Sequence, residues 1–219
     1  MLAGLFLYAL GVVLTLQANI GYAPWDVFHN GISKTTGISI GMASILVGLV
    51  LIVIVTLLRE RLGLGTILNM LLIGIFIDII LSLPIIPLME GFVTGIIMLV
   101  IGLFVIASAS YFYIGSGFGA GPRDSLMVAL MRKTKQPVGI CRAAVEFASV
   151  IIGWSLGGML GAGTIIFAFG IGFCVQVTFR LLKFDATSVE HETLAQTYRL
   201  HKRSLSQLIR TLGETRERK

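Results

Sequence analysis

Six predominantly apolar runs dominate the hydropathy pattern of this chain, and polar connectors separate them. Each run has about eighteen or more residues, which is enough for a helix to cross the roughly 30 Å hydrocarbon layer of a bilayer. The pattern predicts an all-α membrane protein with six transmembrane helices. Their expected bounds are 1–19, 40–58, 64–83, 92–115, 138–156 and 163–182. Composition supports this class, since the mean hydropathy is +0.93 and only 13% of the residues are charged.

The second half of the chain repeats the first half without a gap. The segment Gly-Tyr-Ala-Pro-Trp-Asp at 21–26 returns as Gly-Ala-Gly-Pro-Arg-Asp at 119–124, and Gly-Leu-Gly-Thr at 63–66 returns as Gly-Ala-Gly-Thr at 161–164. When residues 1–74 are aligned in this register, about 19 positions are identical. Apolar bias alone does not readily align both prolines and both aspartates, so the pattern indicates an internal duplication.

The duplication predicts that the two halves have opposite orientations in the membrane. Each half, 1–83 and 92–183, contributes three transmembrane helices, and an odd number of crossings brings the second half in from the other side. Each half also contains a short helical stretch, at 24–35 and 122–134, that opens with proline. About twelve residues span only about 18 Å, so these stretches are expected to be interfacial or re-entrant.

The distribution of basic residues predicts the orientation. Of the 17 Lys and Arg residues, only Lys34 falls in the connectors on the side opposite to the C-terminus. Basic residues gather on the cytoplasmic side of membrane proteins, so both termini are expected to be cytoplasmic. The first apolar run lacks a basic leader and has a repeat partner, which argues against a cleaved signal peptide.

The last segment, 184–219, differs in character from the integral membrane domain at 1–183. It is charged and carries apolar residues at roughly helical spacing between Leu194 and Leu212. The sequence predicts a cytoplasmic amphipathic tail. Packing on the inner face of the membrane domain and docking of a partner both remain open for it.

Charged residues expected at membrane depth are the candidates for function, because burying them in the bilayer is costly. Two interpretations of the paired aspartates remain open. They are favourable helix starts beside a positive dipole end, and they also suit a ligand site where two half-helices converge. The candidate substrate-binding residues are Trp25, Asp26, His29, Arg123, Asp124, Arg142 and Glu146.

Other polar residues favour structural roles. Arg142 and Glu146 lie four residues apart and can form an ion pair on one helix face, whether or not they bind a ligand. Asp78 has no charged repeat partner, which favours a capping or interfacial role. Four amides expected within the bundle are weak indicators of a polar cavity: Gln17, Asn19, Asn69 and Gln176.

The two proline motifs resemble those of the YczE/YyaS/YitT family of bacterial integral membrane proteins, most closely its YczE-like branch. The resemblance rests on Gly21-x-x-Pro24-Trp25-Asp26 and on the 119–124 segment, and it covers roughly residues 1–183. It implies a bacterial plasma-membrane protein, with no site residues to transfer and with some members thought to influence secondary-metabolite production.

No pairing of nucleophile and base, metal-ligand cluster or phosphate loop is recognisable in the sequence. We therefore expect no enzyme, no cofactor, no metal and no nucleic-acid partner. The leading hypothesis is a small secondary transporter or exporter of an unidentified solute, with its site between the repeats. The alternatives are a membrane scaffold acting through the tail and a substrate-binding subunit of a separate energising module. Besides the bilayer and the solute, a homodimer is compatible with six helices per chain.

Overall fold

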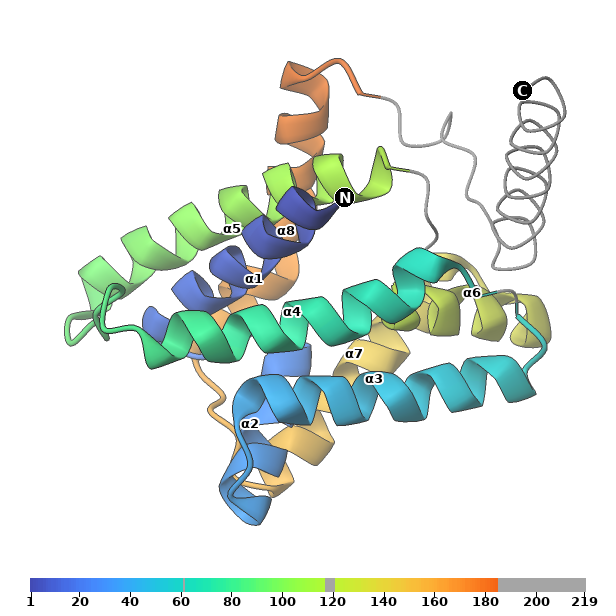
Figure 1. Ribbon diagram of the computed structural model, residues 1–219, viewed down its shortest axis with the longest axis horizontal. Helices are drawn as coiled ribbons and strands as arrows, with labels where there is room; N and C mark the ends of the chain where they lie inside the picture. The colour runs from blue at the N-terminus through green and yellow to red at the C-terminus, as the bar shows by residue number, and fades with distance from the viewer. Residues whose placement is uncertain (61, 117–120, 185–219) are drawn as a thin grey trace, which may run out of the picture.

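The computed structural model describes residues 1–60, 62–116 and 121–184, and all regular secondary structure in these ranges is α-helical (Figure 1). The helices are α1 (Leu2–Gln17), α2 (Pro24–Thr36), α3 (Ile40–Leu57), α4 (Leu64–Ser82), α5 (Phe92–Ile114), α6 (Pro122–Thr134), α7 (Val138–Ser155) and α8 (Ala162–Leu181). The tail beyond residue 184, and with it the predicted amphipathic helix, lies outside the described residues, as do the first two positions of the second proline motif.

The long helices occur where hydropathy predicts them. In the described ranges, five helices are long and apolar enough to cross a membrane, namely α3, α4, α5, α7 and α8. Helix α1 is equally apolar in character but has 16 residues, which corresponds to about 24 Å. The chain is thus a multi-pass membrane protein, and a sixth crossing by α1 stays a prediction.

Helices α2 and α6 are the short stretches that the proline motifs predict. Each begins with proline at its first position and carries an aspartate in its first turn. Each ends at a residue in the left-handed region, Gly37 with φ 78° and Lys135 with φ 57°. The two helices therefore have the same length and the same kind of start and end.

The helices of the second half follow those of the first at constant spacing. Both short helices, and likewise α3 and α7, begin and end in the register of the sequence repeat, and α8 begins in register with α4. The turns before α4 and α8 are also alike, because the backbone N–H of Gly63 donates to Thr66 Oγ1 and that of Gly161 donates to Thr164 Oγ1.

The eight helices of the described ranges pack as two groups of four. Helices α1, α4, α5 and α8, here the α1 group, pack around the α1–α5 crossing, and α8 lies beside α5 (Figure 1). Helices α2, α3, α6 and α7, here the α2 group, pack against one another. The main helix contact between the groups is that of α3 with α4.

Glycines bring α1 and α5 together in antiparallel orientation. A Cβ at Gly4 would contact Tyr113, whereas one at Gly95 would meet the carbonyl oxygen of Ala18. At the centre of the crossing, a Cβ at Gly11 would lie 2.6 Å from Ile106 Cγ1. Such small residues permit close helix approach within a membrane.

The contact of α3 with α4 is closed by a hydrogen-bonded aspartate. Asp78 accepts a hydrogen bond from the backbone N–H of Gly41 at 2.8 Å and another from the Ser39 hydroxyl. Ser39 in turn accepts from the Met42 N–H, as the N-cap of α3. Asp78 thus supports the start of α3, which agrees with the capping role expected from the sequence.

Candidate functional site

A cavity of about 280 Å³ lies between the two helix groups, and all eight helices contribute to its wall. Its volume is near the lower end for small-molecule sites. The first turns of both short helices project into it, through Pro24 to Asp26 on α2 and Pro122 to Asp124 on α6. The duplicated motifs therefore lie together in space although they are far apart in the sequence.

Asp26 and His29 form a buried pair on α2. Asp26 Oδ1 lies 3.2 Å from His29 Nδ1, and the two residues are 4% and 1% exposed. A spacing of three residues places both side chains on one helix face. His29 does not line the cavity. It lies behind Asp26 and holds that carboxylate in place.

Arg123 links the two proline motifs. One of its guanidinium nitrogens lies 3.3 Å from His29 Nε2, and its Cζ lies 4.9 Å from the centre of the Trp25 ring, which is a cation–π contact. Arg123 replaces Trp25 at the equivalent repeat position, so this contact joins two residues that occupy the same place in the two motifs. The two motifs therefore contribute different side chains to the site, which makes it asymmetric.

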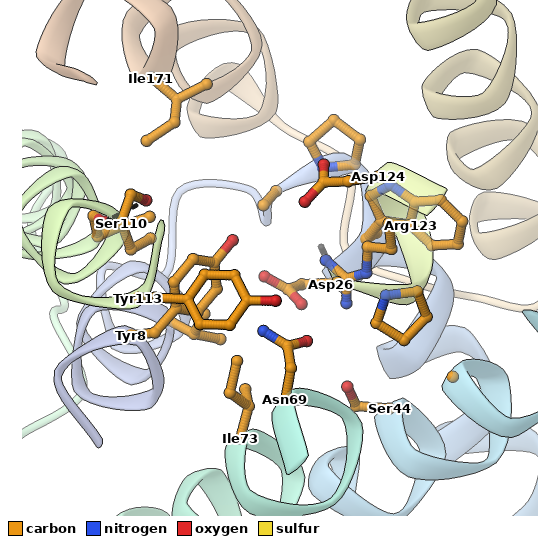
Figure 2. Close-up of a pocket in the computed structure, with 18 of the residues that line it drawn as sticks. Tyr8, Asp26, Ser44, Asn69, Ile73, Ser110, Tyr113, Arg123, Asp124 and Ile171 are labelled. Atoms are coloured by element: carbon orange, nitrogen blue, oxygen red, sulfur yellow. Dashed lines mark hydrogen bonds between the residues drawn. The ribbon is translucent and has the colours of Figure 1, made fainter. Parts of the chain in front are cut away.

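Asp124 has a different environment from Asp26. Its side chain is exposed, because it protrudes into the cavity between the helices. Tyr8 of α1, Tyr113 of α5 and Asn69 of α4 also line the cavity, and Figure 2 shows these three side chains pointing into the space beside both aspartates. The α1 group thus supplies hydroxyl and amide groups opposite the charges of the α2 group.

Arg142 and Glu146 of α7 form the ion pair that their spacing predicts. Arg142 Nε donates to Glu146 Oε1 at 2.9 Å, and both residues line the cavity. The Arg142 side chain is 54% exposed, so the pair lies at an accessible part of the wall. An exposed pair of this kind adds little to stability, and the guanidinium remains able to bind a second acceptor.

Helix α8 supplies an apolar wall. Phe167, Ile171 and Val175 face the cavity from one side of the helix. Their repeat partners on α4 are Asn69, Ile73 and Ile77, which also line it. The cavity is therefore charged along α2, α6 and α7 and largely apolar along α8.

The structure brings six of the seven predicted site residues to one cavity and places the seventh, His29, directly behind them. Of the four amides, Asn69 lines the cavity, whereas Gln17 and Asn19 bind the carbonyl oxygens of Ile86 and Met89 and so secure the connector before α5. Tyr8 and Tyr113 were not predicted. A tyrosine within an apolar run carries no signal that distinguishes a cavity from a packed core.

Comparison with known proteins is consistent with the motifs. The model of DUF6198, described as a family of unknown function, matches residues 1–180. An uncharacterised membrane protein of Bacillus subtilis, YczE, is 35% identical over 80% of this chain and 81% of its own length. An uncharacterised protein of Haemophilus influenzae is 32% identical over 80% of both chains, and the B. subtilis protein YyaS is 25% identical over 74% of this chain and 82% of its own. No solved structure matches.

Proposed function

The chain belongs to DUF6198, the family of YczE-like membrane proteins, and we propose that it is a small secondary transporter or exporter of a small solute. The observation that carries the proposal is the cavity itself. Two short helices start at its wall, and their first turns present Asp26, Arg123 and Asp124 to one space. Transporters commonly bind their substrates where the N-termini of interrupted helices meet within the membrane.

We infer further that the two halves are inverted repeats of three crossings each. The constant helix spacing supports this, and so does the antiparallel crossing of α1 and α5. Helix contacts also recur in pairs, since α1 packs on α4 as α5 packs on α8, and α2 packs on α7 as α6 packs on α3. In this proposal both termini lie in the cytoplasm of a bacterial cell and the protein resides in the plasma membrane.

The lining favours a solute with both charged and apolar parts. Two cationic groups, Arg123 and Arg142, lie on the same wall as three carboxylates, and the α8 side is apolar. A zwitterionic or cationic head beside Asp124 would leave an apolar body against Phe167 and Ile171. A site of about 280 Å³ restricts this solute to a small molecule.

Ligand-induced stabilisation of the purified protein tests the site. We would screen zwitterionic and cationic amphiphilic metabolites, amino acids and inorganic ions by thermal unfolding in detergent. A ligand at about one hundred times its Kd stabilises the folded state by roughly 2.7 kcal/mol, which raises the unfolding temperature measurably. The shift should disappear in Asp124→Asn and persist in Glu90→Gln, a control carboxylate in an exposed connector outside the cavity.

Transport is then measured with the ligand that gives the shift. Proteoliposomes with the wild-type chain should accumulate or release that ligand, and those with Asp124→Asn should not. A ligand shift that survives Asp124→Asn would remove the cavity as its binding site. Binding without movement of the ligand across the bilayer would contradict the transporter proposal.

A further inference from the structure

We propose that α7 and α8 form a gate that is open in this structure and that closes by making the contact that α3 and α4 make now. The inference rests on the proposed transporter function and deepens it, because it states how the cavity changes the side to which it opens. In this mechanism the α2 group rocks against the α1 group. In this structure α3 and α4 seal one end of the cavity. In the proposed second conformation, α7 and α8 seal the opposite end instead.

The sealed contact has six positions at helical spacing. On α3 they are Gly41, Ile45 and Gly48, and on α4 they are Met70, Gly74 and Asp78. A Cβ at Gly41 would overlap the carbonyl oxygen of Gly74, and one at Gly74 would lie 2.6 Å from the carbonyl oxygen of Gly41. The two backbones are therefore in direct contact, and no larger residue fits between them.

The equivalent positions on α7 and α8 make no such contact. They are Gly139, Ala143 and Glu146 on α7 and Ala168, Gly172 and Gln176 on α8. Within the described residues, α7 packs on α2 and α6, and α8 packs on α5, but α7 and α8 do not pack along one another. A Cβ at Gly139 or at Gly172 would have no heavy atom within 4 Å outside its own surroundings in the helix.

The exposure of these positions also differs between the α3–α4 contact and its repeat partners on α7 and α8. Gly41, Gly48, Met70 and Gly74 are buried, whereas all of the equivalent positions except Glu146 are exposed. Both halves nevertheless keep the same two glycines, Gly41 with Gly139 and Gly74 with Gly172. Glycine inside a helix costs about 1 kcal/mol relative to alanine, so an exposed pair has no local advantage. A second conformation in which α7 and α8 approach closely accounts for the presence of both glycines.

Side-chain sizes on α7 and α8 fit this closed form. In the present contact Met70 of α4 fills the space beside Gly48 of α3, with Met70 Cβ 3.4 Å from a Cβ built on that glycine. The second half reverses the sizes, because Glu146 replaces the glycine and Ala168 replaces the methionine. Gln176 replaces Asp78, and its amide oxygen can accept from the Gly139 N–H as the aspartate accepts from Gly41.

The end of the cavity that α3 and α4 close is closed by the connector before α8 as well. The backbone N–H of Tyr22 donates to Met159 O, and that of Gly163 donates to Ile20 O at 2.7 Å. Lys34 Nζ donates to Gly157 O, which holds the end of α2 to the same connector. In the proposed orientation this end faces outward, so the cavity is open toward the cytoplasm, beside Arg142 and Glu146.

Disulfide formation between α7 and α8 tests the gate without any substrate. The pair is Ala143→Cys with Gly172→Cys, because their repeat partners touch: a Cβ at Gly74 would lie 2.5 Å from Ile45 Cγ1. The background is Cys141→Ala with Cys174→Ala, since both native cysteines are free thiols. The control is Ala143→Cys with Phe173→Cys, whose repeat partner Ile75 is exposed and lies one residue from Gly74, about 100° around the helix.

Oxidation in native membranes should close the test pair at least about tenfold faster than the control pair, because a disulfide needs Cβ atoms within roughly 4.5 Å. Unfolding temperatures close to wild type confirm that the variants fold. Equal rates, or no disulfide in either pair, would overturn the gate. A disulfide in the test pair without any transported ligand would keep the gate and reject the transporter.

A second variant keeps the native cysteines. The valine side chain of Gly172→Val has room in this conformation, so the variant should fold and still bind the ligand found in the screen. Uptake of that ligand should fall by about tenfold or more, because α7 and α8 can no longer meet. Uptake at the wild-type rate would contradict the gate.

Discussion

At the residue scale, the two motif aspartates occupy the same helix position in two different environments. Asp26 is buried and paired with His29, whereas Asp124 is exposed to the cavity. Both carry out the helix-start role, since each lies in the first turn of its helix. The helix-start interpretation therefore holds at both positions, and the ligand-site interpretation stays a prediction that Asp124 suits better than Asp26.

Alanine substitution should separate these roles. Asp26→Ala leaves the buried Nδ1 of His29 without its partner, so the free energy of unfolding should fall by about 1–3 kcal/mol. Asp124→Ala removes a group that is accessible in the cavity, so it should cost less than about 1 kcal/mol while abolishing ligand-induced stabilisation. Thermal unfolding of both variants, with and without ligand, measures this. Equal destabilisation by the two changes would contradict the assignment.

At the element scale, glycines decide which helices touch. Gly153 of α7 packs against the backbone of α2, where an added Cβ would lie 2.5 Å from Phe28 Cα. Gly158 and Gly31 extend the same contact. The short helix α2 is thus held to α7 backbone against backbone, which explains how a helix of 13 residues is positioned at the cavity.

Valine at two glycines of α7 should therefore have very different effects on the free energy of unfolding. Gly153→Val forces α2 away from α7, and the overlap with backbone should cost about 2 kcal/mol or more. Gly139→Val enters open space, and its effect on the free energy of unfolding should stay within about 1 kcal/mol. Unfolding temperature and yield of folded protein in detergent measure the contrast. Strong destabilisation by Gly139→Val would show that α7 already packs closely there.

At the scale of the whole molecule, the helices form two groups with a cavity between them. The groups are joined by α3 and α4 on one side and separate along α7 and α8 on the other. A rigid-body motion of one group against the other changes few contacts within either group. The arrangement therefore suits alternating access around a fixed site.

The orientation of the whole bundle is tested by labelling cysteines in intact cells. Leu88→Cys lies in the exposed connector before α5 and should react with a membrane-impermeant maleimide from outside. Lys133→Cys, at the exposed end of α6, should react only after the cells are opened, because basic residues gather on the cytoplasmic side. The reverse pattern would invert the proposed topology, and labelling of both would contradict the number of crossings.

Deleting residues 185–219 distinguishes the transporter from the scaffold predicted as its alternative. The last of the helices that form the cavity, α8, ends at Leu181. The shortened chain should therefore fold and bind ligand like the full chain. Stabilisation by ligand and uptake into proteoliposomes measure this. If the deletion abolishes the cellular phenotype while Asp124→Asn has no effect, the scaffold becomes the better explanation.

Local pattern was enough to predict the long and short helices and six of the residues that line the cavity. Hydropathy marks an apolar helix wherever it packs, and Pro24 and Pro122 start helices because their rings suit the first turn. The spacing of Arg142 and Glu146 likewise predicts their ion pair, since four residues bring side chains to one helix face.

Only the tertiary structure decided which residues of different helices meet. The contact of His29 with Arg123, and the positions of Tyr8 and Tyr113 at the cavity, depend on how α1, α2, α5 and α6 cross. The unequal packing of the two halves is also invisible in the sequence, which keeps Gly41 and Gly74 of the first half as Gly139 and Gly172 in the second. Helix formation depends on neighbours along the chain, whereas the cavity and its open side depend on packing between segments that the repeat makes equivalent.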